Sequence, residues 1–272
     1  SESGILHNAT LVRQLISEME YGPGVMDICD LGLELDGFDD IERIDGGELI
    51  EKIGDAYATY GEDDTIILCR SNKRAIKYNL GIRSTVQFKE ERLVRDDKLM
   101  IVKNCYQFVE NVEGMDYIAN GDIAMLKRIR RFEEFYGFRF ADAVLSFGDY
   151  NDTEIECKIL LDTINSESPS LTREESRRLF DEVEQDYLDI RSKIKRYKEI
   201  RENPHYNAVQ VKFAYAVTCH KAQGGQWRAV FIDRCLFGDE PMSKDILRWL
   251  YTAITRATDK VYLVNFDDRF FE

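Results

Sequence analysis

Two short segments near the end of the sequence carry side chains suited to phosphate chemistry. The first, VTCHKAQGGQW at residues 217–227, is a glycine-flanked turn that precedes an apolar run at residues 229–233. Its polar side chains supply hydroxyl, imidazole, ammonium and amide groups, from Thr218, His220, Lys221 and Gln223. Backbone and side-chain donors on such a turn suit phosphate oxygens, so we expect this segment to contact a phosphate group.

The second segment is YTAITRA at residues 251–257, which predicts a helix of small residues that ends before an apolar strand at residues 261–264. Its only cation is Arg256, whose guanidinium is always charged and matches the geometry of phosphate oxygens. A lone arginine near a helix end more often meets the helix dipole. The surrounding residue pattern favours the phosphate role for Arg256.

The elements that would position these segments follow the pattern of an α/β domain. Thr65–Cys69 is a short, fully apolar run, which is typical of a buried parallel strand. Amphipathic patterns predict helices on both sides of it, at residues 8–20, 47–60 and 72–81. Strands and helices in alternation indicate a parallel sheet covered by helices.

A different pattern begins near residue 88. Short β-like segments broken by Asn, Asp and Gly predict a small β barrel, with strands at residues 99–102, 107–109, 117–118, 123–126 and 143–145. A capping box at residues 172–175 and apolar residues in steps of three and four then predict one helix of about 30 residues, about 45 Å long. An Asn-Pro pair at residues 203–204 ends this helix. Sheet-like residues resume at residue 208, so we expect the barrel and the helix to be an insertion in the α/β domain.

The composition is that of an ordinary globular protein. The chain has 272 residues, of which 44% are hydrophobic and 11% aromatic, enough for one large domain or two small ones. No apolar run approaches the roughly 20 residues that cross a bilayer, and no signal peptide is visible, so we expect a cytoplasmic protein without a membrane partner. Six scattered cysteines and three distant histidines show no metal-binding spacing, so no metal ligand is predicted.

The net charge of −14 is unfavourable for a protein that binds nucleic acid over its whole surface. Two locally basic stretches, at residues 70–83 and 127–131, leave room for a restricted binding groove. In the second stretch we expect ordinary surface charges of the barrel. In the first, a solvated helix face and nucleic-acid contact are equally compatible with Arg70, Lys73, Arg74 and Arg83.

Residues 217–227 and 251–257 together resemble motifs V and VI of superfamily-one DNA helicases. The order of the elements is similar to the RecD and Dda branch, which includes proteins called exodeoxyribonuclease V alpha subunits; the similar segments are at residues 69–83, 99–106 and 119–123. The resemblance covers most of the chain. It implies an α/β fold, the second RecA-like motor domain of the P-loop NTPase type without its own P-loop, with an inserted SH3-like β barrel and a long helix. The implied segments are motor at residues 1–90, barrel at 91–170, helix at 171–203 and motor at 204–272.

By this resemblance the chain would be part of an ATP-dependent DNA helicase that moves 5′ to 3′ on single-stranded DNA and acts in DNA repair or recombination. Gly225 and Gln226 would lie near the nucleotide, and Arg256 would be the catalytic arginine finger that stabilises charge on the γ-phosphate. Gly225-Gln226-Trp227 replaces the usual triplet with a carboxylate, so Gln226 would hydrogen bond the ribose hydroxyl instead. The residues implied in DNA contact are Arg70, Asn72, Lys73, Thr218, His220, Lys221 and Gln223.

The sequence contains no Gly-x-x-x-x-Gly-Lys-Ser/Thr segment, the loop that holds nucleotide phosphates. Residues 230–233 look like a Walker B strand but lack a following acid, and we reject that role. We therefore expect ATP and Mg²⁺ to act only in a longer helicase, in which this chain meets an N-terminal motor domain and other subunits of a repair complex. The chain alone would bind no cofactor and hydrolyse no ATP. The alternative is a non-catalytic module that keeps the motor fold to bind nucleic acid or protein.

Overall fold

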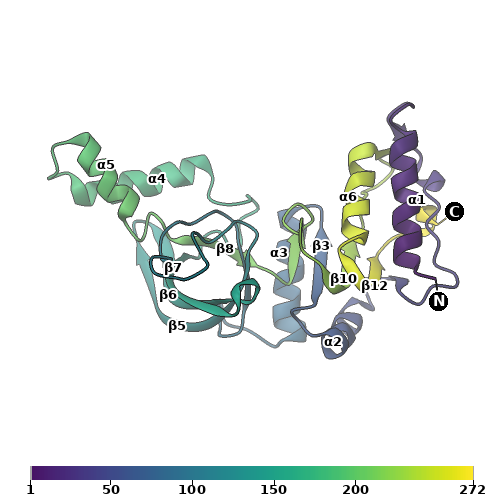
Figure 1. Ribbon diagram of the computed structural model, residues 1–272, viewed down its shortest axis with the longest axis horizontal. Helices are drawn as coiled ribbons and strands as arrows, with labels where there is room; N and C mark the ends of the chain where they lie inside the picture. Colours follow the sequence, from purple (N-terminus) through teal and green to yellow (C-terminus); the bar gives the residue numbers. More distant parts are fainter. Residues whose placement is uncertain (1, 272) are drawn as a thin grey trace. The chain divides into compact units, whose positions relative to one another are not determined.

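The computed structural model describes residues 2–271 and divides the chain into two compact units (Figure 1). Among the described residues, the sheet unit comprises residues 2–88 and 215–271, and the barrel unit comprises residues 89–214. Ser1 and Glu272, the outer limits of the predicted motor segments, lie outside the described residues. The barrel unit extends to residue 214, beyond the predicted start of the second motor segment at residue 204.

The sheet unit is built on five parallel strands in the order β2, β12, β10, β3 and β9. The strands are β2 Ile41–Ile44, β3 Thr65–Cys69, β9 Ala216–Thr218, β10 Trp227–Asp233 and β12 Ala257–Val264. All five residues of β3 are buried, which confirms the buried parallel strand predicted there.

Helices cover both faces of this sheet. They are α1 Gly4–Glu18, α2 Leu49–Tyr60, α3 Asn72–Gly81 and α6 Lys244–Ile254. The crossovers through α2 and α6 run in opposite directions across the sheet, so right-handed connections place the two helices on opposite faces. α1 packs on α6, and Figure 1 shows α3 and α6 on either side of β3.

The predicted helices of the sheet unit are confirmed, but α1 begins earlier than residue 8. Ser3 caps α1, because its Oγ accepts a hydrogen bond from Leu6 N at 3.2 Å. The helix α3 continues beyond its C-terminal residue, Gly81, into a π-helical turn, η2 Ile82–Val86. Arg83 lies in this turn and is buried. A solvated helix face is therefore the wrong interpretation for Arg83. The short elements of this unit are β1 Val25–Met26 paired with β11 Met242–Ser243, η1 Ile28–Asp30 and η5 Asp268–Phe270.

The barrel unit contains a closed five-stranded barrel, which confirms the barrel predicted from its short β-like segments. Its strands are β4 Lys98–Ile101, β5 Ile123–Phe135, β6 Phe138–Phe147, β7 Thr153–Leu160 and β8 Val209–Phe213, with a turn η3 Gly148–Tyr150 before β7. β8 lies in the segment predicted to be motor, but it pairs with β4 on one side and β7 on the other and so closes the barrel. Residues 107–109 form no strand, and the prediction at 117–118 is reduced to one bridge between Cys105 and Ile118.

The prediction of one long helix at residues 171–203 is wrong. The capping box at Thr172 and Glu175 is present, but the chain forms α4 Arg173–Glu184, a 3-10 turn η4 Gln185–Tyr187 and then α5 Lys193–Glu202. Arg196 fixes the fold-back between the two helices. Its Nε donates to Glu184 Oε1 and its Nη1 donates to Ile190 O, both at 2.9 Å.

The apolar repeat that predicted a single helix belongs to two helices packed on the same part of the barrel. Leu179 and Val183 of α4 and Ile200 of α5 join one core cluster with Phe138 and other barrel residues. Ile194, one of the apolar residues of the repeat that predicted a single helix, is 85% exposed. None of the helices in the described part of the chain is both long and apolar enough to span a membrane.

Candidate functional site

The polar turn at residues 219–226 connects β9 to β10. β9 ends at Thr218, which lies beside Cys69, the last residue of β3. The turn then runs from the carboxyl end of β9 back to the amino end of β10, because successive parallel strands require such a return. Its last part is closed by a hydrogen bond from Gly225 N to Ala222 O at 3.1 Å.

Both glycines of the turn have a structural reason to be glycine. Gly224 has a φ of +84°, in the left-handed region. At Gly225, an added Cβ atom would lie only 2.5 Å from Cη2 of Trp227. Trp227 is 7% exposed, so it packs beneath the turn and is not available to stack a base.

Asn79 of α3 holds the strand that leads into the turn. Its Nδ2 donates to Ala216 O at 2.9 Å, and its Oδ1 accepts from Ala216 N at 2.7 Å. β9 is an edge strand with one strand neighbour, and this buried amide replaces part of the missing partner. Sequence reasoning gave Asn79 no role, because nothing local shows that its side chain reaches a strand 137 residues away.

Arg256 lies at the amino end of β10 and β12. The sequence predicted that Arg256 lies on the helix, but in the structure it occupies the link between α6 and β12. Its carbonyl oxygen accepts from Trp227 N at 2.9 Å, and its Nη1 donates to Gly225 O at 3.1 Å. Its Nε is buried and has no hydrogen-bond partner within residues 2–271. The guanidinium is thus fixed against the turn, and its Nε donates to none of the described residues.

Burial affects two titratable groups of this turn. It raises the pKa of the Cys219 thiol to about 11, and the positive charge of Arg256 opposes that shift. It also lowers the pKa of Lys221, which is partly buried. Cys219 therefore remains a neutral thiol at pH 7, and the fixed charge beside the turn is that of Arg256.

The predicted DNA-contacting residues Arg70, Asn72 and Lys73 follow β3 and lie beside the end of β9, at the opposite end of the strands from Arg256. Arg70 contacts Cys235 O and forms an ion pair with Glu240, with Nη1 and Oε1 3.0 Å apart. Lys73 is exposed and has no side-chain partner among the residues that the structure describes. The positive charge available at this end is therefore smaller than the sequence suggested.

Arg74 is also committed to a partner. It holds the carboxylate of Asp233, at the end of β10, through two hydrogen bonds of 2.8 Å and 2.7 Å, and Tyr78 adds a third of 2.6 Å. This bond with Asp233 raises the pKa of Arg74, and burial raises that of Tyr78. Asp233 is 1% exposed, and both of its carboxylate oxygens accept hydrogen bonds in this network.

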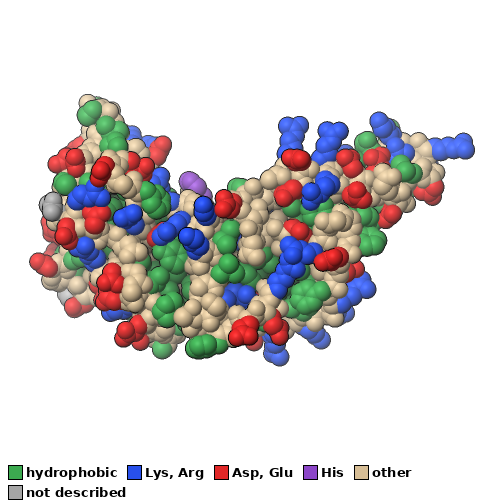
Figure 2. All heavy atoms as spheres, turned by 180° about the vertical axis from the view of Figure 1, so that it is seen from behind, with side chains coloured by type: hydrophobic (Ala, Val, Ile, Leu, Met, Phe, Trp, Pro, Cys, Tyr) green, Lys and Arg blue, Asp and Glu red, His purple; other side chains and the backbone are tan. Residues whose placement is uncertain are grey.

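The remaining predicted residues of the turn face solvent. The exposed residues among them are His220, Gln223 and Gln226, and no side-chain partner of these three is found within residues 2–271. Figure 2 shows acidic and basic side chains intermixed over the face in view, so the charge of −14 forms no continuous acidic field there. The structure brings Gly225, Gln226 and Arg256 together at one end of the strands, and Thr218 with residues 70–73 at the other.

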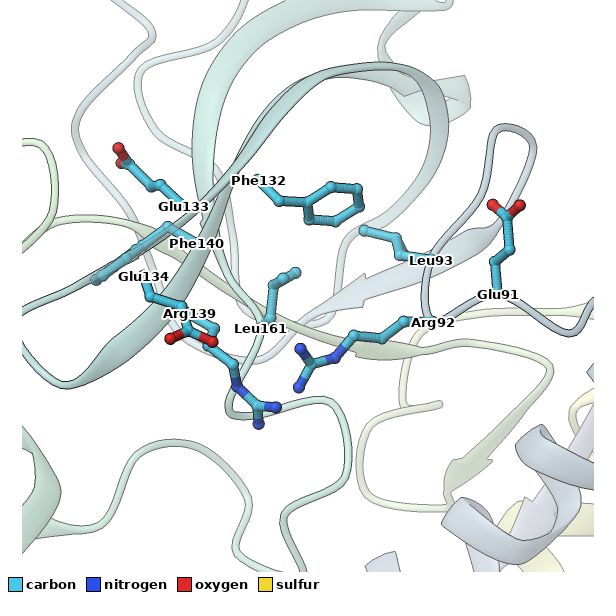
Figure 3. Close-up of a pocket in the computed structure, with 9 residues that line it drawn as sticks. All are labelled: Glu91, Arg92, Leu93, Phe132, Glu133, Glu134, Arg139, Phe140 and Leu161. Atoms are coloured by element: carbon cyan, nitrogen blue, oxygen red, sulfur yellow. The ribbon is translucent and has the colours of Figure 1, made fainter.

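Within residues 2–271, no group of three His, Cys, Asp or Glu side chains is placed to hold a metal ion. The barrel unit contains a pocket of about 340 Å³ beside β5 and β6, which sequence reasoning missed because its walls come from segments far apart in the chain (Figure 3).

Residues 213–264 match the family model of the UvrD-like helicase C-terminal domain. This stretch contains the polar turn and Arg256, so the match supports the resemblance to superfamily-one helicases over both motif segments. No curated protein matches the chain.

Two solved helicases are similar to the chain in structure. The Pif1 helicase from Bacteroides, in complex with ADP-AlF3 and ssDNA, is 12% identical with a TM-score of 0.41, over 82% of this chain and 46% of that one. The Pif1 helicase from Candida albicans is 12% identical with a TM-score of 0.37, over 76% and 46%. The chain thus spans about half the length of either helicase, and likenesses this weak carry no argument about function.

Proposed function

We propose that the chain is the second motor domain of an ATP-dependent DNA helicase of the RecD and Dda branch, with an SH3-like barrel inserted in it. The observation that carries the proposal is the hydrogen bond between Arg256 and Gly225, 31 residues apart in sequence. It joins the two segments that resemble motifs V and VI. Both segments lie within the stretch that matches the UvrD-like helicase C-terminal domain.

The groups around Arg256 fit a nucleotide phosphate. The guanidinium carries a fixed charge, and its buried Nε lacks a partner within the described residues, so an anionic oxygen would satisfy it. Gln226 is exposed next to Gly225, and its amide suits a ribose hydroxyl. ATP bound with Mg²⁺ supplies a phosphoryl group for transfer to water, and Arg256 would stabilise the charge on the γ-phosphate.

Phosphates of single-stranded DNA would lie along the carboxyl ends of β9 and β3. Thr218 ends β9, His220 and Gln223 are exposed on the turn, and Lys221 adds a partly buried ammonium. Asn72 and Lys73 open α3, whose N-terminus favours an anion. Arg70 would contact DNA only after its ion pair with Glu240 opens, so we expect it to contribute least.

A longer protein would complete the motor. This sequence has no phosphate loop of the Walker A type, so we propose that an N-terminal motor domain of the same protein supplies it. The chain alone would then hold neither ATP nor Mg²⁺ and would be inactive. Movement from 5′ to 3′, and association with other subunits of a repair or recombination complex, are parts of the same proposal that rest on the resemblance.

The test is DNA-stimulated ATP hydrolysis by the longer protein carrying Arg256→Ala. If Arg256 is an arginine finger, turnover should fall roughly 10³-fold, while binding of a fluorescent ATP analogue changes little. Arg248→Ala is the matched control, because Arg248 is an exposed residue of α6 that forms an ion pair with Asp245, three residues away. Unchanged turnover in Arg256→Ala would disprove the finger. DNA binding without any ATP hydrolysis by the unsubstituted protein would favour the non-catalytic module.

A further inference from the structure

The pocket on the barrel unit has no part in the proposed motor chemistry, yet it combines an apolar wall with a charged rim. It forms where the loop before β4, the hairpin of β5 and β6 and the chain after β7 meet (Figure 3). All of its lining residues belong to the barrel unit. Its volume of about 340 Å³ lies at the lower end of the ~300–1,000 Å³ of ligand pockets, and a second hollow that shares Glu91, Leu93 and Phe132 adjoins it.

The wall of the pocket is apolar and includes an exposed aromatic ring. Leu93, Phe140 and Leu161 form its buried part. Phe132, on β5, is 54% exposed beside them. A ligand that covers the Phe132 ring would remove apolar surface from water, which favours an apolar group as the occupant.

The rim holds two guanidinium groups with unused donors. Arg92 is exposed and has no hydrogen bond or ion pair within residues 2–271. Arg139 is held only loosely through its side chain, with Nε 3.6 Å from Asp162 Oδ1. Figure 3 shows both guanidinium groups on the same side of Leu161, opposite the Phe132 ring. Two guanidinium groups at one rim can bind both oxygens of a carboxylate.

We propose that this pocket binds the C-terminus of a partner protein. The apolar side chain of the partner's last residue would pack against Phe132 and Leu161, and its α-carboxylate would bind Arg92 and Arg139. Capture of a terminal carboxylate is a recurring mode of peptide recognition, and here the two guanidinium groups of Arg92 and Arg139 at one rim favour it.

The acidic residues of the pocket argue for this occupant over a nucleic acid. Glu91, Glu133 and Glu134 line the same pocket, three carboxylates against two guanidinium groups. Glu133 is engaged by Lys158 and His205, but Glu134 is exposed. A run of phosphates would be repelled by these carboxylates, whereas a single carboxylate needs only the space between Arg92 and Arg139.

The test uses the full chain and a fluorescein-labelled pentapeptide, Gly-Gly-Ala-Leu-Phe, with either a free C-terminal carboxylate or a C-terminal amide. Fluorescence anisotropy should show that the free acid binds about tenfold or more tightly than the amide, because the amide loses the charge-assisted hydrogen bonds. Arg92→Gln and Arg139→Gln should each weaken binding of the free acid by a similar factor. Phe132→Ala should weaken both peptides, and Glu134→Gln should strengthen binding of the free acid.

Arg177→Gln on α4 is the matched control, since Arg177 is exposed and lies outside the pocket; it should bind like the parent. Thermal unfolding of each variant checks that the barrel unit stays folded. Equal binding of acid and amide, or no binding up to millimolar peptide, would overturn the proposal. So would displacement of the peptide by a thymidine oligonucleotide that itself depends on Arg92 and Arg139, because the pocket would then be a nucleotide site. None of these results depends on ATP hydrolysis, so this proposal and the motor function fail independently.

Discussion

A single position, Gly225, controls both the packing of the turn and the place of the guanidinium. An added Cβ atom would lie 2.5 Å from Cη2 and 2.9 Å from Cζ3 of Trp227. The carbonyl oxygen of Gly225 also accepts the hydrogen bond from Arg256 at 3.1 Å. Any side chain here must therefore move either the indole ring or the backbone that positions Arg256.

We expect Gly225→Ala to destabilise the sheet unit by about 1–3 kcal/mol, the usual cost of overpacking a closely packed site. Both tryptophans, Trp227 and Trp249, lie in the sheet unit, so urea unfolding followed by tryptophan fluorescence reports on it. Gly54→Ala is the control. Gly54 lies in α2, where an added Cβ meets nothing within 4 Å, so this change should stabilise by about 0.5–1 kcal/mol. If the free energy of unfolding changed with the same sign in both variants, the packing argument would be contradicted.

Local patterns predicted most of the elements, and the errors occur where distant segments decide the structure. The apolar run of β3 and the amphipathic α2 and α3 depend on near neighbours, and they form as expected. The sequence of β8 is compatible with a strand of the parallel sheet or of the barrel. Its pairing with both β4 and β7 places it in the barrel. The break between α4 and α5 depends on Arg196 reaching Glu184, and an apolar repeat alone does not reveal such a fold-back.

In the candidate site too, contacts between distant segments could not be predicted from local patterns. The motif segments predicted which residues carry phosphate-binding groups, and the structure adds the contact between Arg256 and Gly225. The ion pair of Arg70 with Glu240 could not be predicted from the sequence, because the two residues are 170 positions apart. Because such partners neutralise positive charge, a basic stretch in the sequence overstates the charge available to a ligand.

A charged cluster ties together three strands of the barrel. Lys158 of β7 is 7% exposed; its Nζ lies 2.7 Å from Asp142 Oδ1 of β6 and also contacts Glu133 of β5. The hydrogen bond from Lys158 lowers the pKa of Glu133. Burial alone would raise the pKa of Asp142, but hydrogen bonds from Lys158 and Arg131 outweigh it, and that pKa is also lowered.

Both shifts predict that acid weakens the barrel unit. The folded-state pKa values lie below the unfolded values, near 3.9 and 4.3 for model Asp and Glu, so the unfolded chain binds more protons as pH falls. The stabilisation that these two carboxylates contribute is complete above about pH 5 and is lost as the pH falls through their folded-state pKa values. Urea midpoints by circular dichroism at pH 7, 5 and 3 should fall less steeply in Lys158→Met than in the parent. Lys193→Met, at an exposed lysine of α5, should match the parent; an equally steep fall in Lys158→Met would exclude the cluster as the cause.

For the whole molecule, the charge balance limits how nucleic acid can be held. The chain carries 37 basic and 51 acidic residues, and many basic side chains already pair with acids. Long-range attraction of DNA is therefore weak, and binding must come from a few close contacts. Positive groups at the carboxyl ends of β3 and β9 include those of Arg70, Lys73 and Lys221.

A salt titration of the chain with a thymidine oligonucleotide measures how many of these cations meet phosphates. With two or three contacts, the logarithm of the association constant should fall with the logarithm of salt concentration at a slope of about −1.4 to −2.1, since each phosphate contact on a single strand contributes about −0.7. Lys73→Gln should make the slope shallower by about 0.7, because Lys73 stands at the start of α3 without a partner among the described residues. Lys77→Gln, at another exposed lysine of α3, should leave it unchanged. The same slope in both variants would mean that the DNA does not contact the start of α3. A slope near −4 in the parent would mean that the ion-paired arginines open to bind phosphate, contrary to the small role expected for Arg70.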